Sequence, residues 1–135
     1  VFAPQNVLLP VVAAHPQFVT LAELGGPRDA ASDWPFLENG TRGGLASFLA
    51  PLRPGEDLWI HMRGLGRDPS LLNWTWGSAN AVIRPLSVEY EDYNPGWHVV
   101  KFPVPADTPS GPVLLRVKVT GETDAATILI PVAVP

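Results

Sequence analysis

The stretch "KFPVPADTPSGPVLLRVKVTG", residues 101–121, decides the class of fold. Its prolines hold the chain extended, and Ser110-Gly111 then supplies a turn that leads into an alternating apolar run. Alternation with a period of two is typical of a strand with one face in a core and the other in water. The stretch therefore predicts a rigid corner followed by a half-buried strand. Its core-facing residues would be Val113, Leu115, Val117 and Val119, with Arg116 and Lys118 facing outward.

The remaining sequence repeats this pattern of short strands and turns. The chain has 135 residues, the size of one domain, and contains 16 prolines and 12 glycines. Proline at that frequency excludes long helices and favours strands joined by turns. We therefore predict an all-β fold, an antiparallel immunoglobulin-like β-sandwich of about 7–9 short strands with an extra N-terminal apolar strand. Strands are expected at 6–14, 57–63, 74–83, 86–93, 97–104, 113–120 and 126–134, with 17–24 as a strand or one helical turn and 25–44 as a long connection.

Composition excludes several classes of function. The net charge is −4 and the nine basic residues are scattered, so no nucleic-acid partner is predicted. The chain has no cysteine, which removes disulfides, thiolate nucleophiles and cysteine-based zinc sites. No apolar run approaches the ~20 residues of a membrane-spanning helix.

No arrangement of side chains predicts an enzyme, a cofactor or a metal site. No serine lies in a nucleophile elbow, and the three histidines are far apart in the sequence. The acidic stretch "EYEDYN", residues 89–94, matches no calcium-loop spacing, so we interpret it as a charged strand edge in contact with solvent.

Two segments carry a family resemblance. They are "ASFLAPLRPGEDLWIHMRGLG", residues 46–66, and "WHVVKFPVPADTPSGPVLLRVKVTGETDAATILIPV", residues 97–132. Together they resemble the immunoglobulin-like (IPT/TIG-like) β-sandwich module at the C-terminus of many long secreted bacterial proteins. The matching features are a start of small residues and Phe48, a Pro54-Gly55 turn, a Gly64-Leu65-Gly66 strand end and the "VPADTPSG" corner. The middle of the chain is more aromatic and more acidic than the family pattern.

The resemblance divides the chain and implies a class of function. Residues 44–135 would form the sandwich, and residues 1–43 would supply N-terminal strands and a long connection that serves as an inter-subunit arm. The family implies a non-catalytic extracellular packing or assembly module and no substrate. The first residue, Val1, is not a methionine, so we expect an extracellular or cell-surface protein after removal of a signal peptide.

The opening segment "VFAPQNVLLPVVAAHP", residues 1–16, is apolar, and the first charged residue of the chain is Glu23. Such a segment must pack on its own sandwich or on that of a neighbour. In the first case it is an edge strand of its own domain. In the second it adds a strand to the next subunit and builds a filament, with Pro10 restricting pairing to one side. The predicted assembly strand consists of Val7, Leu8, Leu9, Val11, Val12 and Ala13, and Val7, Leu9, Val11 and Ala13 would fill a groove.

Aromatic side chains supply the alternative. Trp74 and Trp76 lie two residues apart and would share one face of a strand, where exposed rings stack on sugars and buried rings fill a core or an interface. The candidate aromatics are Trp59, Trp74, Trp76 and Trp97. Asn39-Gly-Thr and Asn73-Trp-Thr are sequons, so Asn39 and Asn73 are candidate glycosylation sites.

The sequence leaves two functions open. The first is a structural subunit that self-assembles by strand addition and apolar burial, with itself or neighbouring domains as partner. The second is a carbohydrate-binding or adhesion module of a larger secreted protein, with a glycan as ligand.

Overall fold

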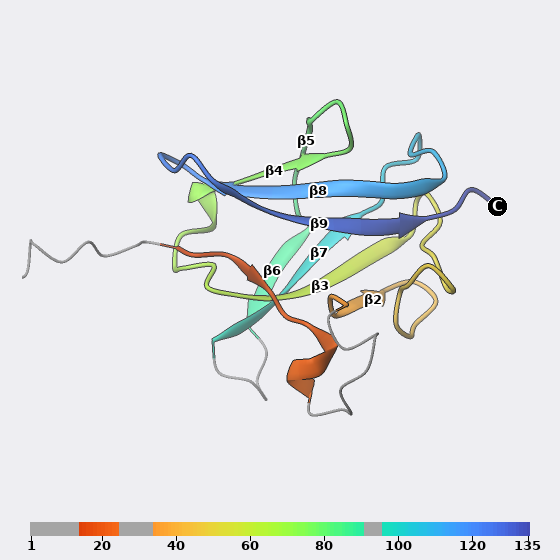
Figure 1. The fold of residues 1–135 in the computed structure, drawn as a ribbon, viewed down its shortest axis with the longest axis horizontal. Coiled ribbons are helices and arrows are strands. Elements are labelled where there is room, and N and C mark those ends of the chain that lie inside the picture. The colour runs from red at the N-terminus through yellow and green to blue at the C-terminus, as the bar shows by residue number, and fades with distance from the viewer. Residues whose placement is uncertain (1–13, 25–33, 91–95) are drawn as a thin grey trace, which may run out of the picture.

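The computed structural model of the chain describes residues 14–24, 34–90 and 96–135, and it shows two antiparallel sheets packed face to face (Figure 1). One sheet has the order β1-β3-β7-β6, with β2 also paired to β3, and the other has the order β5-β4-β8-β9. The strands of the described residues are β1 (Gln17–Phe18), β2 (Leu37–Asn39), β3 (Asp57–Arg63), β4 (Leu72–Trp76), β5 (Ala81–Ile83), β6 (Ser87–Tyr90), β7 (Trp97–Pro103), β8 (Gly111–Val119) and β9 (Ala125–Val132).

The core forms between the inner faces of the two sheets, as the alternating patterns predict. On β3, Leu58 and Ile60 are fully buried and lie opposite Phe102 and Val100 of β7. From the other sheet, the ring of Trp74 meets Phe102 edge to face, with centroids 4.9 Å apart. This two-layer packing confirms an all-β, immunoglobulin-like sandwich.

The proline-rich corner before β8 has the predicted form. Gly111 has a φ of 130°, a region that residues with a side chain rarely adopt. The buried hydroxyl of Thr108 accepts a hydrogen bond from Trp76 Nε1 at 3.2 Å, which ties the corner to β4. Along β8 the four predicted apolar residues are buried, and Arg116 and Lys118 are exposed.

Three predicted segments differ from the structure. The strand predicted at 74–83 is a hairpin of β4 and β5, because Gly77 and Asn80 adopt positive φ angles of 76° and 53° and reverse the chain. The connection predicted at 25–44 contains β2. The segment 17–24 contains both β1 and a single turn of 3₁₀ helix, Leu21–Leu24.

The described strands before residue 44 add to one sheet of the sandwich. Both β1 and β2 pair with β3, so this part of the chain continues one of the two sheets. Of the apolar strand predicted at 6–14, only Ala14 lies within the described residues. No helix in the described parts of the chain is long and apolar enough to cross a membrane.

Candidate functional site

Strand β9 lies at one end of its sheet (Figure 1). The described residues leave most of its outer edge without a backbone partner. Its inner edge pairs with β8 along its whole length. At its outer edge, Leu52 alone among the described residues bonds to the backbone, through Leu52 N to Pro131 O at 3.0 Å and Ala133 N to Leu52 O at 2.9 Å. This pairing is parallel and covers only the end of the strand.

The backbone groups of Thr127 and Leu129 point outward from this edge. The direction of N–H and C=O alternates along a strand, and Pro131 C=O already points outward to Leu52. Thr127 and Leu129 lie four and two residues before Pro131, so their N–H and C=O groups point the same way. Within the described ranges no backbone group bonds to them on that side. The β9 edge therefore offers two N–H and two C=O groups to an added strand.

An apolar groove of about 370 Å³ runs beside this edge. Leu37 of β2 and Ile128 of β9 are buried beneath it, and Trp34, Phe48 and Leu129 stand along its rim. The rings of Trp34 and Phe48 support one another edge to face at 5.4 Å. Phe48 and Leu129 are half exposed, and the described residues lining the groove carry no ionisable side chain. Exposed apolar side chains gathered at an unpaired strand edge are typical of a docking surface.

An ion pair between the buried Glu56 and the partly exposed Arg42 lies near the point where Leu52 meets β9. Glu56 is only 8% exposed and accepts hydrogen bonds from Arg42 Nε at 2.5 Å and from Arg53 N at 2.7 Å. Hydrogen bonding to Arg42, together with the other donors, lowers the pKa of Glu56 to about 2 despite its burial. Arg42 Nη2 also donates to Pro51 O at 2.9 Å. The pair therefore holds the chain that leads into Leu52.

The two predicted glycosylation sites lie in different surroundings. Asn39 is 5% exposed; its Oδ1 accepts from the N–H groups of Thr41 and Arg42, and its Nδ2 donates to Glu56 at 3.2 Å. In the folded protein this side chain is enclosed, so Asn39 is not accessible as a glycan acceptor. Asn73 is exposed, and its Nδ2 donates to Thr120 Oγ1 at 2.9 Å.

The four candidate tryptophans divide between the core and an outer face. Trp74 and Trp76 share one face, as predicted, but that face is buried in the core, so neither ring is available to stack on a sugar. Trp59 and Trp97 are partly exposed on the outer face of the β3–β7 sheet. They are four positions apart along the paired strands, or about 13 Å at the usual rise per residue.

The outer face around Trp59 is crowded with internal contacts. Lys101 Nζ lies 4.3 Å from the Trp59 ring centroid and 3.0 Å from Glu89 Oε2. A methyl group at Gly40 would overlap the indole at 2.2 Å, so the ring is also covered from that side. Nearby, His61 Nε2 and Glu38 Oε1 are 2.5 Å apart. These partners leave little of the Trp59 ring for a ligand.

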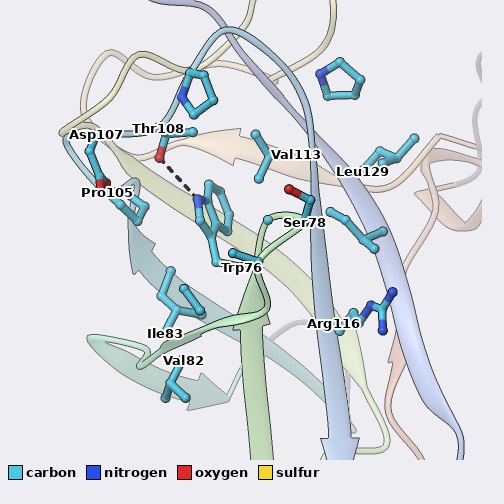
Figure 2. Close-up of a pocket in the computed structure, with 16 residues that line it drawn as sticks. Trp76, Ser78, Val82, Ile83, Pro105, Asp107, Thr108, Val113, Arg116 and Leu129 are labelled. Atoms are coloured by element: carbon cyan, nitrogen blue, oxygen red, sulfur yellow. Dashed lines mark hydrogen bonds between the residues drawn. The ribbon is translucent and has the colours of Figure 1, made fainter.

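A second hollow of about 620 Å³ lies beside the β4–β5 hairpin and the proline corner (Figure 2). Trp76 and Thr108 meet at one end of it, and its other polar side chains are those of Ser78, Asp107 and Arg116. Among the described residues no histidine lines the hollow, so Ser78 has no base beside it there of the kind that activates a nucleophilic hydroxyl.

The described residues contain no group of three or more His, Cys, Asp or Glu side chains placed to hold a metal ion. His61 and His98 lie on neighbouring strands, but at adjacent register positions, so their side chains are on opposite faces of the sheet. Neither a protein-family model nor a curated protein matches this chain.

The predicted assembly residues, Val7 to Ala13, lie outside the described residues. The groove and the β9 edge that would receive them were not predicted. The sequence does carry one signal for this surface, because the segment "AATILIPV", residues 125–132, contains no charged residue of the kind that usually protects an outer strand.

Proposed function

We propose that the protein is a non-catalytic structural subunit that assembles with copies of itself by strand addition. The leading segment, residues 1–13, of one copy would pair with the β9 edge of the next and lay alternate side chains in the groove. The observation that carries this proposal is the β9 edge, which the described residues leave mostly unpaired, beside a groove whose described lining is uncharged. The leading segment of the chain also has no charged residue.

The two surfaces are chemically matched. An added strand would satisfy the outward N–H and C=O groups of Thr127 and Leu129, and its side chains would cover the exposed parts of Phe48 and Leu129. Residues 7–13 span about 23 Å when extended, which is comparable with the length of β9. Because donor and receptor are different surfaces, each copy can both give and receive a strand. Such contacts propagate into a filament unless they close into a ring.

The proposed setting is extracellular, at the surface of a bacterial cell. It is supported by the immunoglobulin-like fold and by the IPT/TIG-like resemblance of residues 46–66 and 97–132. The absence of cysteine agrees with an assembly held by strand pairing and apolar burial alone.

Carbohydrate binding is the second candidate, and it is favoured by Trp59 and Trp97 on one outer face. It has less support, because Trp74 and Trp76 are buried and Trp59 is covered by Gly40 and Lys101. Saturable binding of a glycan by the monomer, lost with Trp97→Ala, would favour this candidate over assembly.

Deleting residues 1–13 is expected to abolish assembly. The intact chain should sediment above 14.5 kDa with a mass that rises with concentration, and the truncated chain should remain a monomer. A matched control lacking only residues 1–5 keeps Val7 to Ala13 and should assemble like the intact chain. Circular dichroism and tryptophan fluorescence check that both truncated proteins are folded. An intact chain that stays monomeric over the full concentration range would refute the proposal.

A further inference from the structure

We infer that the added strand runs parallel to β9, that its odd-numbered residues Val7, Leu9 and Val11 enter the groove, and that it comes from a second copy. This inference rests on the proposed assembly and specifies its geometry. Three features of the chain lead to it: Pro10 in the leading segment, the pairing of Leu52 with β9, and the position of Ala14.

Pro10 determines which residues of the added strand can bond to β9. Proline has no N–H, so a strand tolerates it where its backbone nitrogen points away from the adjacent strand. Because N–H directions alternate, Leu8 and Val12 then also point away from β9. The odd-numbered residues Leu9 and Val11 direct their backbone groups towards β9, where Thr127 and Leu129 present the matching groups.

The direction of the added strand then decides which side chains face the groove. On β9 itself, Ile128 faces the core and bonds to β8, whereas Leu129 faces outward with its backbone pointing to the open edge. A parallel strand at that edge runs in the same direction as β9 and turns the same face to the core. Its core-facing residues therefore point their backbone groups the same way as Ile128 does, and on that strand this is the direction of β9. Parallel addition therefore places Leu9 and Val11 in the groove. In an antiparallel strand the core-facing residues point their backbone groups away from β9, so Leu8 and Pro10 would lie in the groove instead.

Leu52 already shows the parallel arrangement at this edge. It runs parallel to β9, bonds to Pro131 and Ala133, and is fully buried with its side chain in the core. A parallel strand beside Thr127 and Leu129 would extend the same mode of pairing along β9. It would also leave Pro10 on the outer side and an uninterrupted row of aliphatic residues on the groove side.

The position of Ala14 excludes the chain's own leading segment as the parallel partner. Ala14 lines the same hollow as Ala125 and Ala126, where β9 begins. In a parallel pair, residue numbers rise in the same direction on both strands. In a parallel strand from the same chain, the residues before Ala14 would therefore lie beside residues before Ala125. They would not reach Thr127 and Leu129. A strand that runs parallel to β9 must therefore come from another copy.

A matched pair of substitutions tests the orientation. Leu9→Asp places a charge in the groove and is expected to weaken assembly at least about 10-fold, whereas Leu8→Asp places the same charge in solvent and should change it by less than about 3-fold. The measurement is the concentration at which half of the protein is assembled in analytical ultracentrifugation. The reverse order, or equal losses, would overturn the parallel orientation and leave assembly itself established. A wild-type chain that never assembles would overturn both.

A mixing experiment tests whether the strand comes from a second copy. One partner carries Thr127→Pro, which blocks the β9 edge and keeps the leading segment. The other lacks residues 1–13 and keeps an open edge. Neither should assemble alone, and together they should form a one-to-one complex of about twice the 14.5 kDa mass of the chain. Separate monomers after mixing would overturn donation between copies.

Discussion

Replacing Glu56 by glutamine is expected to lower the free energy of unfolding by about 2–3 kcal/mol at neutral pH. The carboxylate is buried and accepts hydrogen bonds from Arg42, Arg53 and Asn39. A glutamine side chain has one acceptor oxygen in place of two. Its NH2 group, which is a donor, would face the N–H donors of Arg42. It also leaves the partly exposed guanidinium of Arg42 without its counter-charge. Urea unfolding followed by tryptophan fluorescence measures the difference.

The same substitution has a defined pH dependence. The pKa of Glu56 in the folded protein is about 2, below its usual value of 4.5, so the unfolded chain binds more protons between these values. The contribution of Glu56 is therefore complete above pH 4.5 and is lost as the pH falls towards 2. The stability difference between wild type and the glutamine variant should shrink across that window. The exposed Glu122→Gln serves as control and should change stability by no more than about 0.5 kcal/mol. A glutamine variant as stable as wild type at pH 7 would refute the role of this ion pair.

Thr127→Pro is expected to abolish assembly while leaving the monomer folded. Thr127 is exposed, and its N–H points away from β8, so a proline there removes no hydrogen bond of the sandwich. Pro131, four register pairs further along the same strand, also has its backbone nitrogen on the outer edge. The ring takes away one of the two outward N–H groups and fills the space that an added strand needs. We expect no assembly even at about 10 times the concentration at which half of the wild-type protein is assembled, which corresponds to a loss of at least about 1.4 kcal/mol of association free energy.

Thr127→Val is the matched control for this variant. It has almost the same shape and keeps the backbone N–H, so assembly should remain within about 3-fold of wild type, and sedimentation of both variants tests the comparison. Assembly that persists in the proline variant at wild-type concentrations would show that β9 is not the receiving edge.

The strands with regular alternation were predictable from local sequence alone. In β3 and β8, apolar residues recur at every second position and prolines or glycines bound the run, so period and limits both follow from the residues. Strand β2 has only three residues and no such period. It is a strand because it pairs with β3, which is a tertiary effect that local propensity does not contain.

The candidate site depends on features that a single sequence does not encode locally. The two-residue spacing of Trp74 and Trp76 predicts a shared face but not that this face lies in the core. The sequon at Asn39 is a local motif, whereas its burial arises from Glu56, which is 17 residues away in the sequence. The open edge of β9 depends on the order of strands in the sheet, so it becomes visible only when both sheets are known.

Amide hydrogen exchange at Thr127 and Leu129 tests strand addition most directly. Their N–H groups point away from β8, so in the monomer they should exchange quickly, while Ile128, which bonds to β8, is protected. In the assembled intact chain we expect both amides to become protected, and in the chain lacking residues 1–13 they should stay fast at every concentration. Fast exchange at Thr127 and Leu129 in an assembled sample would contradict strand addition, because it would show that the copies join without pairing to the β9 edge.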